Sequence, residues 1–212
     1  MNLALPDDIE IAETAREIEA LEGVENNVKL DLILILAGQK SATEILNANF
    51  PTPGRPHVDP NDLKQKLFEL GFECKAVGED PPFESQNIYV GLTQHDVQQL
   101  KTATETKDRH KMGEIYGFPK TAITAYCECE NPPTDMLEIR DLPPEISQSS
   151  YAPFCQFALS PLNWREEIKT AQKWRDTIHT YSPTLYEERQ ALYRESMDRR
   201  IQLAPLTNEE ID

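Results

Sequence analysis

The clearest hydrophobic pattern lies in the C-terminal third of the chain. One apolar stripe consists of Ile168, Ala171, Trp174, Ile178 and Tyr181. Spacing of three and four residues puts these side chains on one face of a helix, and Asn163 with Glu166 forms a capping box at its start. Ser182-Pro183 begins a second helix. Its inward residues are predicted to be Leu185, Tyr186, Leu192, Tyr193, Met197 and Ile201. Two amphipathic helices with a short break predict an αα-hairpin.

Other segments have the pattern of strands. Residues 28–37 form a continuous β-branched and Leu-rich run that predicts a central buried strand, although a buried helix would give the same pattern. Residues 72–77 and 87–92 predict two strands that pair as a hairpin. Residues 136–142 and 151–159 are further candidates, the second because apolar residues occupy alternate positions.

Helix signals separate these strands. Residues 6–21 carry apolar residues at helical spacing, and their outer face is acidic. The predicted inward residues are Ile9, Ala12, Ala15 or Arg16, Ile18, and Leu21 or Glu22. The predicted outward residues are Glu10, Glu13, Glu17 and Glu19. Ser41 with Glu44 resembles a capping box and predicts a helix through Asn49, followed by a proline-rich loop. Asp59-Pro60 starts a helix that Gly71 ends, and its buried face is predicted to include Phe68. Thr93 starts another, with Val97 and Leu100 inside.

Together these elements predict an α+β or irregular α/β fold, with a small mixed sheet of about four strands and flanking helices. We expect residues 1–160 to form the mixed core and residues 161–204 to pack on it as the helical hairpin, in a single globular unit. The polar, acidic tail at 205–212 is expected to be loose.

Composition restricts the partners and the compartment. The formal net charge is −16, which disfavours non-specific nucleic-acid binding. The longest apolar run is too short to span a membrane, and the acidic N-terminus does not resemble a signal peptide. Four irregularly spaced cysteines do not suggest a disulfide framework. A soluble, cytoplasmic protein is therefore expected.

Candidate chemistry concentrates at residues 109–126. Gly117 favours a positive φ and Pro119 favours a helix start, so the amides of Lys120 and Thr121 would face outward. Free amides at the positive end of a helix dipole attract anions. Cations that could reach the same place are Arg109, His110, Lys111 and Lys120. The alternative is an ordinary tight loop whose glycine allows close packing and whose aromatic residues fill the core.

This segment also resembles a known pattern. Gly113-x-x-x-Gly117-Phe118-Pro119-x-Thr121-Ala122-Ile123-x-Ala125-Tyr126 is similar to a stretch of short microbial proteins of unknown function. In those proteins Gly-(Tyr or Phe)-Pro and one variable residue precede two small or Cys residues and an apolar helix. The resemblance covers about eighteen residues. Where the relatives are associated with a Cys pair, this chain has Thr121 and Ala122, and no activity is implied.

Three function classes follow. The first is a protein that binds or acts on a small phosphate- or carboxylate-bearing ligand at residues 117–121, with His110 as the candidate acid/base because its usual pKa lies near neutrality. The second is a non-enzymatic interaction module that uses the acidic N-terminal helix or the C-terminal helices. No cofactor is predicted, but zinc is an alternative through Cys127, Cys129 and Cys155, although the Cys-x-Cys spacing is not the usual one.

Overall fold

A three-stranded antiparallel sheet lies in the first half of the chain in the computed structural model, which describes residues 6–46, 59–78 and 86–203. Its strands are β1 (Ala42–Ile45), β2 (Glu73–Gly78) and β3 (Gln86–Gly91), and β3 is central. In register, Thr43 lies opposite Val90, and Cys74 lies opposite Val90 from the other side. The sequence predicted β2 and β3 and their antiparallel pairing.

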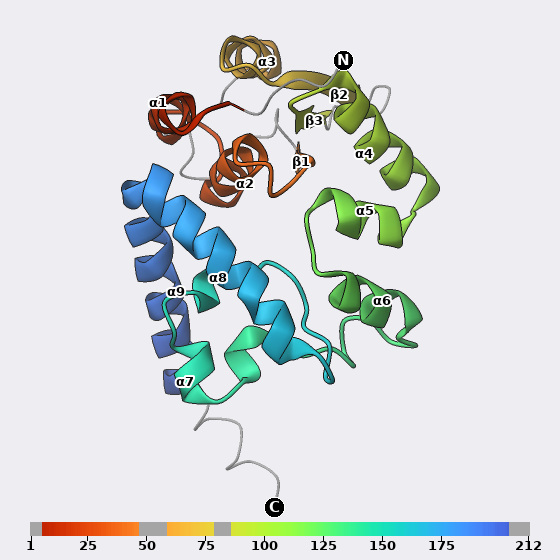
Figure 1. The fold of residues 1–212 in the computed structure, drawn as a ribbon, viewed down its shortest axis with the longest axis vertical. Helices are drawn as coiled ribbons and strands as arrows, with labels where there is room; N and C mark the ends of the chain where they lie inside the picture. The colour runs from red at the N-terminus through yellow and green to blue at the C-terminus, as the bar shows by residue number, and fades with distance from the viewer. Residues whose placement is uncertain (1–5, 47–58, 79–85, 204–212) are drawn as a thin grey trace, which may run out of the picture.

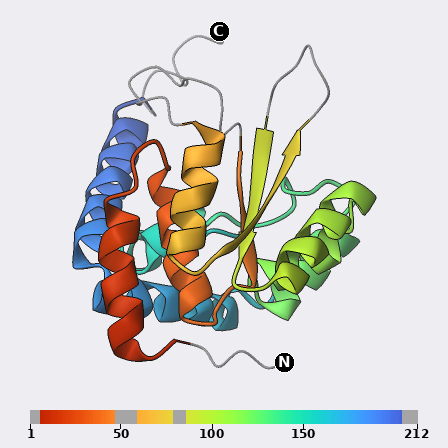
Figure 2. The ribbon, with the colours of Figure 1, turned by 90° about the horizontal axis from the view of Figure 1, so that it is seen from above.

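Helices cover both faces of this sheet. The helices of the N-terminal half are α1 (Asp8–Glu19), α2 (Asn26–Leu36), α3 (Pro60–Glu69) and α4 (Gln94–Thr106). In Figure 2, α1, α2 and α3 lie on one side of the sheet and α4 lies on the other. The side chains of β3 alternate accordingly, because Ile88 and Val90 join the core around α2 while Tyr89 packs with Val97 and Leu100 of α4.

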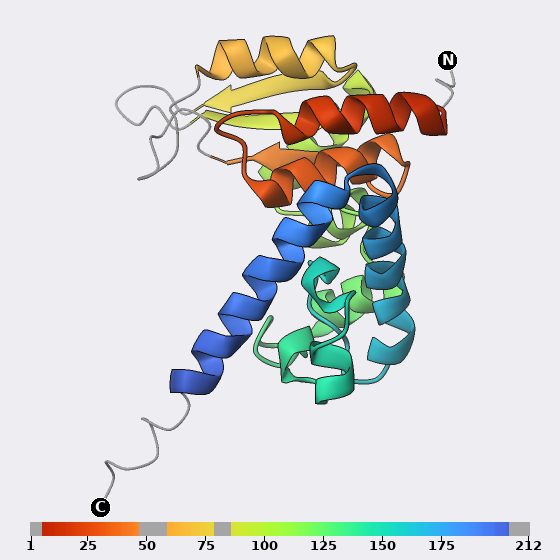
Figure 3. The same ribbon diagram turned by 90° about the vertical axis from the view of Figure 1, so that its left-hand side faces the viewer.

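The second half of the described chain is helical. Its elements are α5 (Arg109–Ile115), α6 (Lys120–Glu128), η1 (Ile139–Asp141), α7 (Pro144–Ser147), η2 (Ala152–Phe154), α8 (Trp164–Tyr181) and α9 (Pro183–Leu203). Figure 1 shows α8 running from below α2 toward α6 and α7. Figure 3 shows α8 and α9 diverging from their junction, with η2 and α7 between them. Trp174 and Ile178 of α8 and Leu185 of α9 join the core that contains α2.

The apolar run at residues 28–37 is a helix, so the strand prediction for it was wrong. Seven of the eleven residues of α2 are buried, because α1, α8, α9 and β1 all contact it. A helix buried over most of its surface has a nearly continuous apolar run, and its pattern therefore matches that of a buried strand. Its end is a Schellman motif, in which the amide of Gln39 donates to the Leu34 carbonyl (2.8 Å) across Gly38, whose φ is 66°.

The helix predicted from Ser41 was also wrong within the described residues, since 42–45 form β1 and the rest of that prediction lies outside them. Ser41, the predicted N-cap, donates its amide to the Ile115 carbonyl at 2.9 Å, and the Thr43 hydroxyl donates to Asp31 at 2.8 Å. Pairing with β3 therefore overrides the local capping pattern. The proline-rich loop after residue 49 also lies largely outside the described ranges.

Two further strand predictions fail. Residues 136–142 and 151–159 contribute a single antiparallel bridge, Leu137 with Leu159, and otherwise form short 3₁₀ turns and loops. The described residues therefore contain three strands where about four were expected. The structure agrees with α+β, with a larger helical share than the sequence suggested.

The remaining helix predictions hold with local corrections. Asp59 caps α3 and Thr93 caps α4 through their side chains, as predicted. The stripe of α8 is buried from Ile168 to Ile178, but Asn163 makes no side-chain cap. Three predicted inward residues are instead exposed, namely Ile9, Phe68 and Leu192. Among the described helices, none combines the length and apolar character needed to cross a bilayer.

Candidate functional site

The junction between α5 and α6 is held by close backbone packing. Asp108 caps α5 by accepting from the amide of Lys111 at 2.9 Å. Gly113 lies against Ile123 of α6, where a Cβ would be 2.7 Å from the Ile123 Cγ1 atom. Gly117 has a φ of 70° and lies against the Gln39 carbonyl, with no room for a Cβ. Both glycines are therefore needed for packing, as the structural interpretation of this segment expected.

A cavity of about 590 Å³ opens beside this junction, and we call it the α5–α6 cavity. Most of its wall is apolar and includes Met112, Phe118, Ala122, Ile123, Phe157 and Ala158. Its uncharged polar wall groups come from Thr104, Tyr116, Tyr126, Cys127 and Gln156. Ligand pockets in proteins have this size and this mixture of an apolar lining with few polar groups. The cavity is therefore the best candidate for a small-molecule site in the described part of the chain.

Two cations lie at the rim of the α5–α6 cavity. Lys107 and Arg109 both line it and are both exposed. The Arg109 guanidinium lies 5.9 Å from the ring centroid of Tyr126, which also lines the cavity. Within the described residues, neither cation is within ion-pair distance of a carboxylate. The rim is thus a place where an anionic group would meet two positive charges that are not already neutralised.

A second, smaller hollow of about 240 Å³ shares three walls with the α5–α6 cavity, namely Tyr116, Phe118 and Gln156. We call it the polar hollow. Its polar groups belong to Asp31, Lys40, Thr43, Glu44, Tyr116 and Gln156. These residues come from α2, the turn after it, β1, the α5–α6 connection and the segment before α8, so distant parts of the sequence meet here.

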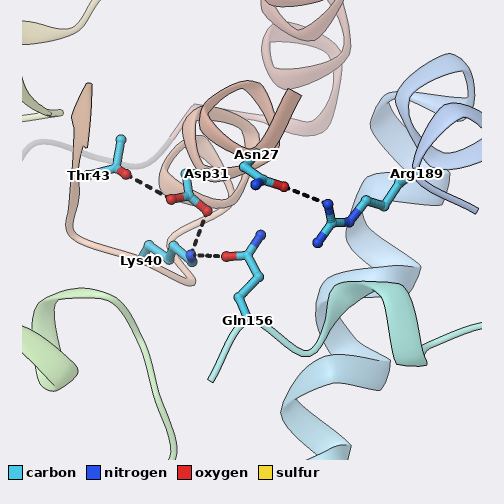
Figure 4. A network of polar contacts seen from close by, with 6 residues as sticks. All are labelled: Asn27, Asp31, Lys40, Thr43, Gln156 and Arg189. Carbon is cyan, nitrogen blue, oxygen red and sulfur yellow. Dashed lines mark hydrogen bonds and ion pairs between the residues drawn. The ribbon is translucent and has the colours of Figure 1, made fainter. Parts of the chain in front are cut away.

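Lys40 is the centre of the polar hollow (Figure 4). Its Nζ atom donates to Asp31 Oδ1 at 2.5 Å and to Gln156 Oε1 at 2.6 Å, and it lies 4.6 Å from the ring centroid of Trp174. The side chain is only 2% exposed, against 16% for Asp31. Burial lowers the pKa of Lys40, while Asp31 opposes that shift by its charge and hydrogen bond. The ammonium is therefore held in place but poorly solvated.

Burial also raises the pKa values of two acidic groups in the polar hollow, Glu44 and Tyr116. The pKa of Glu44 is raised by desolvation, and its hydrogen bonds with Asn87 and Tyr89 reduce that effect. The pKa of Tyr116 is raised, first by burial and then by the charges of Glu44 and Asp31. Perturbed pKa values beside a hollow are a feature of functional sites, although buried ion pairs that only stabilise a fold show them too.

The structure does not gather the predicted basic residues around one point. His110 and Lys111 both face Glu114, at 3.7 Å and 3.3 Å, and neither lines the α5–α6 cavity or the polar hollow. Arg109 belongs to the α5–α6 cavity, whereas Lys120 and Thr121 line a separate hollow of about 450 Å³ next to the start of α8.

The start of α6 lies one residue later than predicted. Pro119 is the N-cap and makes no side-chain cap, and Lys120 and Thr121 are both exposed. Within the described residues neither amide donates a hydrogen bond, as the anion hypothesis requires. However, of the predicted basic residues only Lys120 lines this hollow, and its wall also carries Glu128 and the exposed Leu162. The charge there is therefore weaker than the sequence suggested.

The four cysteines do not lie together in the part of the chain that the structure describes. Cys127 is exposed, and the Cys129 thiol donates to Asp135 at 3.3 Å. Burial raises the pKa of Cys155 to about 12, which keeps this thiol protonated. Across the described ranges, no three His, Cys, Asp or Glu residues are placed to hold a metal ion.

Sequence reasoning missed Asp31, Lys40 and Gln156. One signal was present: Asp31 is a charge inside an otherwise apolar run, and a buried charge needs a partner. Lys40 follows that run after a glycine turn, but its pairing with Asp31 becomes visible only once residues 26–36 are known to be a helix. No local signal indicates Gln156.

Comparisons with protein-family models, with curated proteins and with solved structures found no match.

Proposed function

We propose that the protein binds a small ligand with an apolar body and a carboxylate or phosphate head in the α5–α6 cavity. The observation that carries this proposal is the combination of a largely apolar cavity of about 590 Å³ with two cations at its rim that lack acidic partners among the described residues. The apolar body would fill the space beside Phe118 and Ile123. The anionic head would meet Lys107 and Arg109.

The charge of the chain and the apolar lining of the cavity support this ligand class. The chain carries a net charge of −16, so an anion is repelled by most of the surface and is attracted only where cations stand unpaired. A guanidinium binds a carboxylate or phosphate with two parallel hydrogen bonds, which suits Arg109 for the head group. Each buried methylene contributes about 0.8 kcal/mol, so the apolar body supplies most of the affinity.

This proposal keeps the ligand class expected from the sequence but moves the site. The start of α6 offers Lys120 and a helix N-terminus without a side-chain cap, and it remains the competing location. The two locations are on different hollows and share no lining residue. Single substitutions can therefore separate them.

The experiment is a thermal-shift titration with octanoate and phenyl phosphate, and with acetate and inorganic phosphate as head groups without an apolar body. At a hundredfold excess over Kd, stabilisation is about 2.7 kcal/mol, which raises Tm by about 5–11 °C for a chain of this size. We expect a shift with one or both amphipathic probes and none with the bare head groups.

Matched variants locate the binding. Arg109→Gln and Lys107→Gln should weaken the shift, and Ala158→Phe should abolish it by filling the cavity. Lys111→Gln is the control and should leave the shift unchanged. Lys111 lies on α5 like Arg109, but it pairs with Glu114 and does not line the cavity. A shift that survives Arg109→Gln and Ala158→Phe but disappears in Lys120→Gln would place the ligand at the start of α6 and refute the cavity.

A second candidate function is docking of a basic protein segment. Glu10, Glu13 and Glu17 of α1 line a groove of about 660 Å³ whose wall also includes Leu36 and Leu70. Charged and apolar groups side by side suit a peptide with both characters. A short Lys- and Leu-rich peptide should bind the wild type, and binding should fall with salt and be lost in a Glu13→Lys, Glu17→Lys double variant. Salt-independent binding would contradict this.

A further inference from the structure

The polar hollow contains a lysine that differs from the other cations of the described chain. The Lys40 side chain is almost entirely buried, yet it forms part of the wall of a hollow of about 240 Å³. Its amine therefore has both a desolvated environment and a neighbouring space that a small molecule can enter. A lysine that only stabilises the fold needs the first of these features and not the second.

The groups around Lys40 also suit proton transfer. Asp31 lies 2.5 Å from Nζ through Oδ1, and its other oxygen, Oδ2, accepts from the Thr43 hydroxyl at 2.8 Å. Thr43 thereby fixes the orientation of the carboxylate, so that one oxygen faces the amine. Figure 4 shows Asp31, Thr43 and Lys40 converging in this way. A carboxylate within hydrogen-bond reach of an amine is the geometry required of a general base.

Gln156 also covers the amine, together with Asp31 and the ring of Trp174. It comes from the irregular segment between η2 and α8, and its Oε1 atom accepts from Nζ at 2.6 Å. This side chain is half-buried and lines both the polar hollow and the α5–α6 cavity. Rotation of one amide side chain would therefore expose Nζ to the hollow without disturbing the ion pair.

We infer that Lys40 forms an imine with a small aldehyde or ketone that enters the polar hollow. A hollow of about 240 Å³ limits this compound to a few carbon atoms. The site and the α5–α6 cavity share three walls, but the inference stands without any ligand in the cavity. Desolvated lysines are used in this way as nucleophiles because burial favours the neutral amine.

Asp31 and Lys40 supply and accept every proton that imine formation requires. Asp31 takes one proton from the Lys40 ammonium, and the free lone pair of Nζ attacks the carbonyl carbon. The C–N bond forms as the carbonyl π pair moves to oxygen, which receives a proton from the nitrogen to give a carbinolamine. Asp31 then returns its proton to the hydroxyl group, water leaves, and the nitrogen lone pair forms the C=N bond. The product is a protonated imine beside the Asp31 carboxylate.

The test is reductive trapping of the full chain with propanal and cyanoborohydride, followed by peptide mapping. We expect Lys40 to gain a propyl group severalfold faster than the other lysines, because burial lowers its pKa and so favours the neutral amine. Lys29 is the internal control. It is also buried and its pKa is lowered by desolvation, but it donates to the Glu19 carbonyl and does not line the polar hollow.

Variants separate chemistry from stability. Lys40→Met should lose the fast labelling, and Lys29→Met should retain it. Gln156→Ala should label faster than the wild type, because the cover and one hydrogen bond to the ammonium are both removed. Fast labelling of Lys29 or of surface lysines with Lys40 unmodified in the wild type would overturn the inference, and so would slower labelling in Gln156→Ala. The wild-type peptide map decides the question even if Lys40→Met does not fold.

Discussion

The Asp31–Lys40 ion pair gives the sharpest prediction about stability. Asp31→Ala leaves the Lys40 ammonium, only 2% exposed, with Gln156 and the face of Trp174 as its remaining partners. Removing one partner of a buried pair costs about 3–5 kcal/mol, and the partial exposure of Asp31 favours the lower end. We expect a loss of about 3 kcal/mol, equivalent to a fall in Tm of about 6–12 °C for this chain length.

Lys40→Met should cost less. It leaves the Asp31 carboxylate with the Thr43 hydroxyl and with some access to solvent, so we expect about 2 kcal/mol. The Asp31→Ala, Lys40→Met double variant removes both charges of the pair. Its loss should therefore be clearly smaller than the sum of the two single losses, by about 1.5 kcal/mol or more.

The assay is urea unfolding at equilibrium for the wild type and the three variants, analysed as a double-mutant cycle. Equal slopes against urea would show that the unfolded states are comparable. Additive single losses would refute the reasoning, because they would mean that the two charges do not interact in the folded protein. A cost of less than about 1 kcal/mol for Asp31→Ala would show that the pair is solvated, as surface pairs are.

Three other predictions concern packing, pH and thiol reactivity. Gly117→Ala should destabilise the protein by about 3 kcal/mol, because it combines a positive φ with a clash at the Gln39 carbonyl. Gly71→Ala is the control, since Gly71 has a positive φ but open space around it, and it should cost about 1 kcal/mol. Urea unfolding measures both losses. The raised pKa of Glu44 means that its contribution to stability is present below the usual pKa of 4.5 and is lost as the pH rises through the folded-state value. Glu44→Gln should therefore gain stability relative to the wild type over that range and reach a plateau above it, and a constant difference would contradict this. Iodoacetamide should modify the exposed Cys127 well before Cys155, because burial raises the pKa of Cys155 to about 12. Octanoate should slow the modification of Cys127, because this residue lines the α5–α6 cavity.

N-cap residues in the sequence correctly predicted the starts of helices whose first turn is fixed by a side chain close by in the sequence. Asp59 and Thr93 accept from backbone amides at the starts of α3 and α4, so short-range chemistry alone defines those ends. The α8 stripe was also readable, since its opposite face is polar. The hydrophobic pattern did not distinguish a helix from a strand at α2, because seven of its eleven residues are buried and its apolar run shows no helical period. It failed for β1 because pairing with β3 decides the conformation there.

The candidate site was only partly predictable, for a related reason. The 109–126 segment was identified correctly as a place where chain geometry is tightly specified, since Gly113 and Gly117 both sit against neighbouring atoms. The direction in which its basic side chains point depends on how α5 and α6 pack. In the folded protein Arg109 lines the α5–α6 cavity, whereas the His110 ring lies 3.7 Å from the Glu114 carboxylate. The polar hollow joins residues more than a hundred positions apart and has no sequence motif.

Isothermal titration of octanoate into the wild type and into Ala158→Phe measures occupancy of the α5–α6 cavity directly. We predict saturable one-to-one binding to the wild type with a negative heat-capacity change, as burial of apolar surface requires, and no measurable heat with Ala158→Phe. Equal binding by the two proteins, or no binding by the wild type to either octanoate or phenyl phosphate, would contradict the proposed site.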